Sequence, residues 1–411
     1  MFDYPIAIGL SPNTERDDIL QAIKILFRPW DWKEGKIIEK IEKWFRDYYQ
    51  VDDAVSFNSG RSALMAILKA FNIREGDEVI IQAFTCVAVP GPIIWMGAKP
   101  VYVDIDETFN IDPVTLEKHI TPKTRAIIVQ HTFGTPAKIE LIKKIAQKYN
   151  LVLIEDCAHS LGATVEGKKI GSFGDAAFFS FGRDKIISSV FGGMAILSQK
   201  SKIKNQKLRI SQQKLLFPSY SWILQQLLHP IAFLVILPLY SLSIGKLILA
   251  ILLKLKILSK PVYREEMCGD RPSIFPAKYP NALAMLLVNQ LTKLPKYNQK
   301  RIENAKYYFA QLGRNKDINL PPDESGAVYL RLNILTRNSQ ELLSRAKTKG
   351  IILGNWYREI VDPVGVLYKK IGYEKGSCPQ AEKIASLSIN LPTYPRMAKK
   401  DLDKIMDLFR I

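Results

Sequence analysis

A lysine with unusual neighbours stands near the middle of the chain. Lys185 follows the apolar stretch Phe178–Phe181, and the glycine pair Gly192-Gly193 comes shortly after it. A lysine amine that is partly withdrawn from water can be neutral near pH 7, and a neutral amine attacks an aldehyde to form a Schiff base. Most lysines are solvated surface charges, so Lys185 by itself supports either interpretation.

A second polar group, Glu155-Asp156-Cys157-Ala158-His159, directly follows the apolar stretch Leu151–Ile154. A carboxylate at the end of a central parallel strand lies at the crevice where α/β proteins bind their ligands. There Asp156 could keep a proton on the ring nitrogen of a pyridine-type cofactor. Alternatively, Asp156 caps a helix and His159 is a structural hydrogen-bond donor, and this stretch alone does not decide between the two.

A third group, Asn58-Ser59-Gly60-Arg61-Ser62, lies between a predicted strand and a predicted helix. A glycine at such a turn lets the backbone approach a ligand closely, and the free N–H groups of the following helix attract a phosphate. Arg61 could add positive charge. The simpler alternative is an ordinary strand–helix turn.

These three groups require a framework that brings them to one place. From residue 51 to 197, short apolar runs alternate with amphipathic stretches, a pattern that predicts a mostly parallel sheet covered by helices on both faces. The expected strands are Ala54–Phe57, Glu78–Gln82, Lys99–Asp104, Ala126–His131, Leu151–Glu155, Ala176–Phe181 and Gly193–Leu197, and in the C-terminal part Ala327–Ile334 and Ile351–Trp356. The expected helices are Ser62–Phe71, Val87–Met96, Ala137–Tyr149, Asn281–Phe309, Ser339–Lys349 and Lys399–Leu408.

With their order and spacing, the three groups resemble the DegT/StrS-type sugar aminotransferases, pyridoxal-phosphate (PLP) enzymes of the aspartate aminotransferase fold (fold type I). The similarity runs from about residue 35 to 408 and includes the late stretches 378–382 and 390–395. It implies an α/β protein whose large domain is a three-layer, mostly parallel sheet, followed by a smaller C-terminal α/β domain. We expect the large domain over residues 1–200 and 276–310, an apolar helical insertion over 201–275, and the small domain over 311–411.

The resemblance also implies roles for single residues. Lys185 matches the lysine that holds PLP as a Schiff base and shuttles a proton between the substrate carbon and the cofactor. Asp156 matches the partner of the pyridine nitrogen, and His159 matches the residue beside the ring. These three are the expected catalytic residues.

The remaining expected cofactor contacts are at the phosphate and the face of the ring. Ser180 matches a phosphate-binding hydroxyl, and Gly60 with Arg61 match the phosphate-binding turn. Cys86 stands where the family usually places an aromatic residue over the ring, so that either the stacking is weaker or Phe84 replaces it.

The resemblance implies transfer of an amino group from an amino-acid donor, often glutamate, to a nucleotide-linked keto-sugar in surface-polysaccharide or glycolipid synthesis. It also implies a homodimer with sites at the subunit interface. One alternative is a PLP-dependent sugar dehydratase, although related dehydratases typically have a histidine in place of Lys185. Another is a catalytically silent, membrane-associated regulator or scaffold.

Composition narrows the partners. The formal net charge of +18 suggests an anionic partner, but the basic residues are not interleaved with aromatics as in nucleic-acid-binding modules, so we expect no nucleic acid. The four cysteines are far apart and have no C-x-x-C spacing, which predicts neither a metal site nor a disulfide scaffold and favours a reducing compartment. The start of the chain has no signal-peptide pattern. We therefore expect a cytoplasmic protein.

A strongly apolar run from Trp222 to Leu258 is broken by Pro230 and Pro238 and is flanked by basic residues. One crossing of a membrane would separate Lys185 from the C-terminal unit, and the prolines are expected to interrupt a continuous helix. We therefore expect a helical hairpin or interfacial helices on the inner face of an anionic membrane. The alternative is that another part of the protein, or a second subunit, covers the run.

Overall fold

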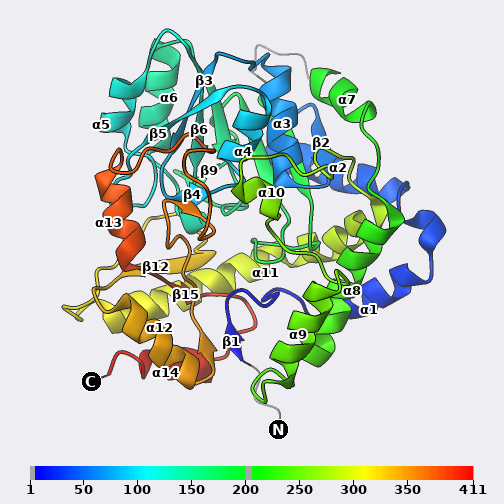
Figure 1. Ribbon diagram of the computed structural model, residues 1–411, viewed down its shortest axis with the longest axis vertical. Helices are drawn as coiled ribbons and strands as arrows, with labels where there is room; N and C mark the ends of the chain where they lie inside the picture. The colour runs from blue at the N-terminus through cyan, green and yellow to red at the C-terminus, as the bar shows by residue number, and fades with distance from the viewer. Residues whose placement is uncertain (1–4, 200–205, 411) are drawn as a thin grey trace.

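The computed structural model describes residues 5–199 and 206–410, and its centre is a seven-stranded sheet (Figure 1). The strand order is β2-β11-β10-β7-β6-β3-β5. The strands from β10 to β5 are parallel to one another, whereas β11 is antiparallel to both of its neighbours. Their bounds are β2 (Ala54–Phe57), β3 (Glu78–Gln82), β5 (Lys99–Val103), β6 (Thr124–Gln130), β7 (Val152–Asp156), β10 (Ala176–Ser180) and β11 (Gly193–Leu197).

Helices cover both faces of this sheet. Because side chains alternate between the two faces along each strand, neighbouring residues of one strand join different hydrophobic cores. In β3, Ile80 joins one hydrophobic core, while Val79 and Ile81 join the core on the opposite face. The helices α3 and α4 contribute to the second core, and α2 and α6 to the first. The helices of this unit are α1 (Arg16–Leu26), α2 (Lys36–Tyr49), α3 (Gly60–Ala70), α4 (Pro90–Trp95), α5 (Pro113–Leu116) and α6 (Ile139–Lys148).

A smaller unit with its own hydrophobic core follows, and α11 (Asn281–Leu312) runs between the two units. Its antiparallel strands are β12 (Arg331–Leu335) and β15 (Ser388–Pro392), and its helices are α12 (Ser339–Thr348) and α14 (Lys399–Met406), while α13 (Pro379–Leu387) adds its buried residues to the second core of the large sheet. The N-terminal strand β1 (Ile6–Ala7) pairs with β13 (Ile351–Ile352) of this unit. The first described residues therefore lie with the small unit, although the expected boundary placed them in the large domain.

Several expected elements have different bounds. The helix expected over Val87–Met96 is the shorter α4, because Pro90 lacks an N–H and suits only a first turn. The strand expected over Ile351–Trp356 ends after two residues, and Ala327–Tyr329 precedes β12 without strand structure. The remaining short elements are β4 (Thr85–Cys86), β14 (Val361–Asp362), β8 (Thr164–Val165), β9 (Lys168–Lys169) and three 3-10 turns over Pro29–Asp31, Glu117–His119 and Thr132–Gly134.

The described part of the basic and apolar segment after β11 contains four helices joined by turns, α7 (Gln206–Gln213), α8 (Tyr220–Ile236), α9 (Ile244–Lys254) and α10 (Arg264–Met267). The expectation that Pro230 interrupts the helix is wrong, since α8 continues through this residue. Burial of Trp222, Leu227 and Ile236 against the protein stabilises α8 and offsets the backbone hydrogen bond that Pro230 cannot make. Within the described ranges, no helix combines the length and apolar character needed to cross a membrane.

Candidate active site

A cavity of about 530 Å³ opens where β7 and β10 end, and all seven predicted site residues line it. It lies at the carboxyl ends of parallel strands, the edge at which α/β sheets bind ligands. Residues that are distant in the sequence meet here. The seven are Gly60, Arg61, Cys86, Asp156, His159, Ser180 and Lys185.

Lys185 and His159 are in direct contact. Lys185 Nζ lies 2.8 Å from His159 Nε2, and the backbone N–H of Phe133 donates to His159 Nδ1 at 3.3 Å. A nitrogen that accepts a hydrogen bond carries no proton, so the proton of this ring lies on Nε2. His159 therefore donates to Lys185, and the lysine can accept only as a neutral amine with a free lone pair.

The surroundings of the pair favour the same protonation state. Burial lowers the pKa of Lys185 from its ordinary value. Burial, together with the nearby charges of Lys185 and Arg331, lowers the pKa of His159 well below its usual range. Since a buried charge is costly, burial favours the neutral form of each group, and Lys185 is a nucleophile when it is neutral.

Asp156 is the last residue of β7, and its neighbours on adjacent strands hold it at the cavity. Its Oδ1 accepts the backbone N–H of Ala158 at 2.9 Å. Burial raises the pKa of Asp156 to about 6, although this hydrogen bond and the charges of Lys185 and His131 lower it. A buried carboxylate of this kind gains from a cationic partner such as a protonated ring nitrogen.

The turn before α3 forms a small cradle. Ser59 Oγ caps the helix by accepting the N–H of Ser62 at 3.1 Å. A Cβ atom on Gly60 would lie 3.2 Å from the Cβ of Ser180, and one on Gly193 would lie only 2.4 Å from the carbonyl carbon of Ser59. The contact at Gly60 is tight and that at Gly193 admits no side chain, so the turn lies close to β10 and β11, and the resulting N–H-rich turn at a helix N-terminus fits a phosphate.

The side chain of Arg61 points to a different partner from the one the sequence suggested. Its guanidinium pairs with the buried carboxylate of Glu266 in α10 and donates to the carbonyl of Pro261 at 2.9 Å. It also lies over the ring of Phe275, 5.2 Å from its centroid. In this geometry Arg61 joins the helical segment to the cavity wall, and its backbone N–H belongs to the first turn of α3.

Cys86 lies in β4, which pairs with β14 at the cavity, and burial raises the pKa of its thiol to about 11. Phe84 does not replace the missing aromatic residue, because it is buried in the second core against Phe133 and Tyr357 and does not line the cavity. The aromatic side chains on the cavity wall near Lys185 are those of Trp356 and Tyr357. The sequence analysis missed them because it placed Trp356 at the end of an expected strand, 351–356, whereas the structure has a turn at Trp356 and Tyr357.

Arg331 is a second residue that sequence reasoning missed. It begins β12, is buried, donates to Asp184 at 3.2 Å and lies 3.4 Å from the centroid of the Trp356 ring. Asp184 precedes Lys185, so this ion pair joins the small unit to the segment that carries the lysine. The stretch Arg331-Leu-Asn-Ile-Leu reads as an ordinary strand, and no local pattern marks its first residue as part of a site.

The helical segment also forms part of the cavity wall through Leu253, Lys260 and Met267. Arg183 anchors it by donating to the carbonyl of Ser259 at 2.6 Å, and Ser259 Oγ in turn donates to Gln226 of α8 at 2.7 Å. The segment is thus held directly against the residues that precede Lys185.

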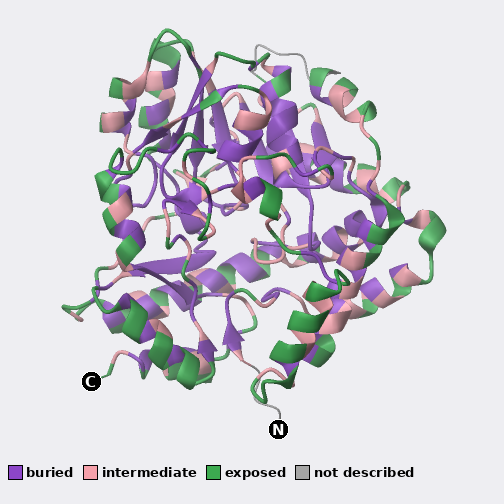
Figure 2. Ribbon diagram, viewed as in Figure 1, coloured by how far each residue is buried: buried purple, intermediate pink, exposed green. Residues whose placement is uncertain are grey.

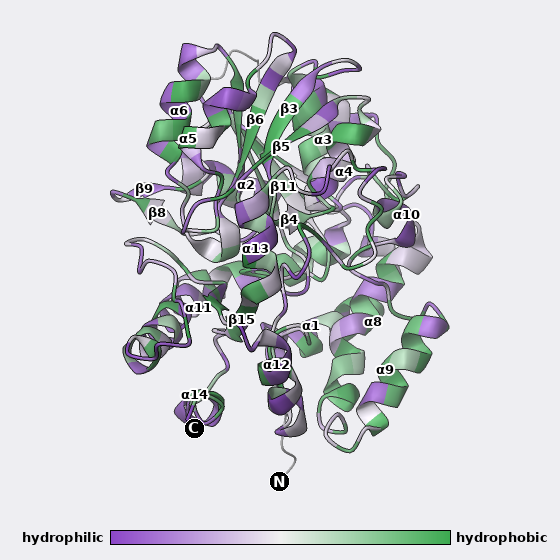
Figure 3. Cartoon of the chain, turned by 60° about the vertical axis from the view of Figure 1, so that its left-hand side comes forward, coloured by the Kyte–Doolittle hydropathy of each residue, from purple (hydrophilic) through white to green (hydrophobic). Residues whose placement is uncertain are grey.

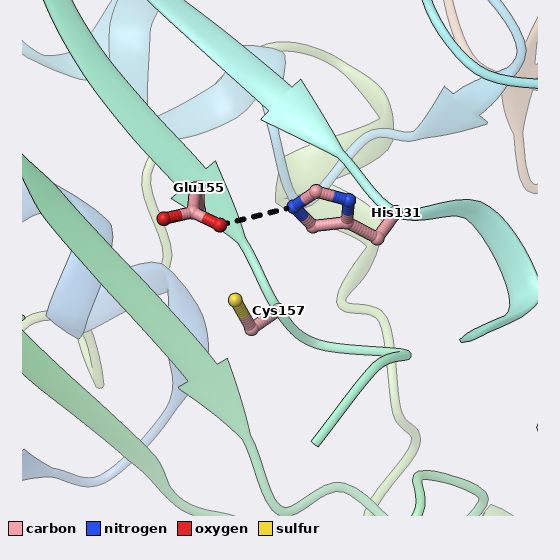
Figure 4. Close-up of side chains that lie close together, drawn as sticks. All are labelled: His131, Glu155 and Cys157. Atoms are coloured by element: carbon pink, nitrogen blue, oxygen red, sulfur yellow. Dashed lines mark ion pairs between the residues drawn. The ribbon is translucent and has the colours of Figure 1, made fainter. Parts of the chain in front are cut away.

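A buried group beside Asp156 contains His131, Glu155 and Cys157 (Figure 4). Glu155 accepts the backbone N–H groups of Gly171, Phe173 and Gly174, each at 2.7 Å, and lies 3.4 Å from His131 Nε2. His131 Nδ1 accepts the N–H of Ala137 at 3.1 Å, so His131 Nε2 carries the proton and faces Glu155. Both carboxylate oxygens of Glu155 thus accept backbone N–H groups, and the group stabilises the ends of β6 and β7.

Comparison with known proteins identifies the family of this chain. The sequence model of the DegT/DnrJ/EryC1/StrS aminotransferase family matches residues 13–214 and 259–410. The chain belongs to this family. The match leaves out residues 215–258, which contain α8 and α9.

Single relatives and a solved structure are also similar to this chain. GDP-perosamine synthase of Caulobacter vibrioides is 42% identical over 47% of this chain and 53% of its own length, so this match spans about half of that relative. An uncharacterized protein of Methanocaldococcus jannaschii is 32% identical over 96% of this chain and 95% of its own. The solved structure of Escherichia coli GDP-4-keto-6-deoxy-D-mannose-3-dehydratase with bound hydrated PLP superposes with a TM-score of 0.75, at 19% identity, over the whole of both chains.

These findings confirm the expected family, the α/β fold with its mostly parallel central sheet, and the PLP-dependent sugar aminotransferase class. The cavity fits that cofactor, since a neutral amine, a buried carboxylate and a glycine-rich helix N-terminus match its aldehyde, ring nitrogen and phosphate.

Proposed function

We propose that this protein transfers an amino group from an amino-acid donor, glutamate above all, to a ketone of a nucleotide-linked sugar. The observation that carries the proposal is the hydrogen bond from His159 to a neutral Lys185 amine, close to the carboxylate of Asp156. The names of relatives, among them a GDP-perosamine synthase and a UDP-N-acetyl-3-dehydro-alpha-D-glucosamine 3-aminotransferase, support this class of acceptor.

Each residue has a separate task in the proposed reaction. PLP, when bound, supplies an aldehyde and an electron-accepting ring. Lys185 Nζ takes the proton from the Cα atom of the donor and later delivers a proton to the sugar carbon that receives the nitrogen. Asp156 holds a proton on the ring nitrogen, and His159 orients Lys185. The cradle of Gly60 and Ser180 holds the phosphate.

Two measurements test this function. Borohydride reduction of the PLP-loaded protein, followed by peptide mapping, should find the pyridoxyl group on Lys185. Glutamate labelled with heavy nitrogen, mixed with a panel of nucleotide-linked keto-sugars, should then yield a sugar that carries the label. A dehydrated sugar without label would indicate a dehydratase, and a protein that binds no PLP would indicate a silent scaffold.

We also propose a homodimer on the cytoplasmic side of an anionic membrane, with a role in surface-polysaccharide or glycolipid synthesis. Support for the dimer comes from the family resemblance. Support for the membrane comes from the apolar run 222–258 and from the absence of any aspartate or glutamate between Asp184 and Glu265.

A further inference from the structure

A second cavity, of about 920 Å³, lies between the tip of the α8–α9 hairpin and the small unit. We propose that this basic cavity binds the phosphate headgroup of an anionic membrane lipid, while the exposed apolar stripe of α9 enters the same leaflet. This inference specifies the ligand of the membrane contact that the proposed function includes, and it rests on that proposed function.

The cavity is strongly basic. Five cationic side chains line it, and none of its described lining residues is acidic. Lys246, Lys347, Lys349 and Arg358 are exposed, and no ion pair within the described ranges involves these four. Such a concentration of uncompensated charge attracts a phosphate. The cationic lining residues are Lys246, Lys347, Lys349, Arg358 and Lys404.

These charges come from segments that are far apart in the sequence. Lys246 lies in α9, Lys347 near the end of α12, and Arg358 in the loop after β13. Tyr240 and Ser241, in the connection between α8 and α9, add two hydroxyl groups to the wall. A cavity with donors on several sides can surround a headgroup, whereas a single row of lysines could only lie along it.

An apolar stripe lies on the same helix as Lys246. Leu247, Ile251 and Leu255 recur every four residues and therefore share one face, and they are 62%, 46% and 63% exposed. Ile244, next to the tip, is 49% exposed. In Figure 2 most of α9 is coloured as exposed, and in Figure 3 much of the same helix is coloured as hydrophobic. An exposed apolar stripe of this kind marks a contact surface.

The combination favours a bilayer over other partners. A basic cavity alone would suit any polyanion, and an apolar stripe alone would suit a second copy of the chain. An anionic bilayer offers phosphate and hydrocarbon next to each other, in the arrangement in which α9 presents lysine and leucine. The family model does not match residues 215–258, which contain α9 with its apolar stripe and Lys246, whereas the other cationic residues of the cavity lie in the matched part.

Vesicle flotation of the full-length, PLP-loaded protein tests the inference. We expect flotation with phosphatidylcholine vesicles that contain about one third phosphatidylglycerol, and weak flotation with phosphatidylcholine alone. The variant K246E/K347E/K349E should reduce the partition coefficient by about tenfold or more, because three attractive charges become repulsive. The matched control K69E/K123E/K316E reverses three exposed lysines outside the cavity and should change it by less than about twofold.

A second variant tests the stripe. L247Q/I251Q/L255Q should also lower vesicle binding by about tenfold, since the apolar face no longer enters the leaflet. The control V114Q/L141Q/L367Q alters three other exposed apolar residues and should leave binding unchanged. Circular dichroism and the absorbance of bound PLP report whether each variant is folded.

Three outcomes would overturn the inference. The first is equal binding to both kinds of vesicle, or binding that the lysine variant does not weaken. The second is a stripe variant that converts a dimer to monomers, which would place a second copy on α9. The third is RNA binding that the lysine variant abolishes while vesicle binding persists. Conversion of bound PLP by glutamate is measured separately, so loss of the proposed reaction would be distinguishable from loss of membrane binding.

Discussion

The cavity around Lys185 and the hairpin of α8 and α9 have opposite patterns of side-chain burial. In the cavity, polar groups are buried, and each of Lys185, His159 and Asp156 has a specific hydrogen-bond partner. On the hairpin, apolar groups are exposed, and only one face of each helix packs against the protein. Buried polar groups change their protonation states, and exposed apolar groups indicate a partner outside the chain. The proposed reaction and the proposed membrane contact therefore depend on separate parts of one molecule.

The largest effect is expected when the Lys185 amine is removed. Lys185→Ala should abolish Schiff-base absorbance and reduce transamination by roughly a thousandfold or more, because it removes the amine that contacts His159 and would both hold PLP covalently and carry the proton. Lys254→Ala, on the exposed face of α9, should leave both unchanged. Absorbance titration with PLP and a coupled glutamate assay measure the two effects. Retention of covalent PLP by the Lys185 variant would place the reactive amine elsewhere.

The next effect concerns Asp156. Asp156→Asn should lower transamination by about a hundredfold, since an amide cannot stabilise a protonated ring nitrogen. Because burial raises the pKa of Asp156 to about 6, the wild-type carboxylate gains a proton as the pH falls through 6. PLP affinity should therefore decrease below pH 6.

Fluorescence titration at several pH values checks this sign. The phosphate of PLP also titrates near pH 6, so the Asp156→Asn variant, which keeps that phosphate effect, provides the reference. The two curves should diverge above pH 6 and converge below it. Parallel curves would mean that Asp156 does not contact the ring nitrogen.

A smaller effect tests the junction between the two regions. Glu266→Gln leaves the guanidinium of Arg61 without its ionic partner, and we expect it to lower the free energy of unfolding by about 2 kcal/mol. Glu265, the neighbouring exposed carboxylate, provides the control, and Glu265→Gln should change stability by less than about 0.5 kcal/mol. Urea denaturation measures both. Equal stabilities would show that the ion pair contributes nothing to the fold.

The smallest effect is expected on the exposed side of α8. Leu234 is 50% exposed, so Leu234→Ala should cost less than about 0.5 kcal/mol, whereas Phe233→Ala, at a 4% exposed position, should cost about 3 kcal/mol. The same denaturation experiment compares them. A large cost at Leu234 would mean that this face is covered, in contradiction of the contrast between the hairpin and the cavity.

Much of the site could be predicted because it depends on local patterns. Apolar stretches that end in Glu155-Asp156 or Phe181-Gly182 mark strand ends, and in a parallel sheet such ends share one edge. The order of the three polar groups along the chain indicated the family, and the family indicated the cofactor. The hairpin was harder to predict, because the effect of Pro230 depends on how much of α8 is buried, and this is a property of the packed protein.

From the sequence alone it follows which residues end the strands, since the period of the apolar residues depends on neighbours along the chain. Only the tertiary structure decided that Arg331 reaches Asp184, that Glu266 takes the guanidinium of Arg61, and that Phe133 sets the tautomer of His159. These contacts join residues far apart in the sequence, so packing, and not local pattern, selects them.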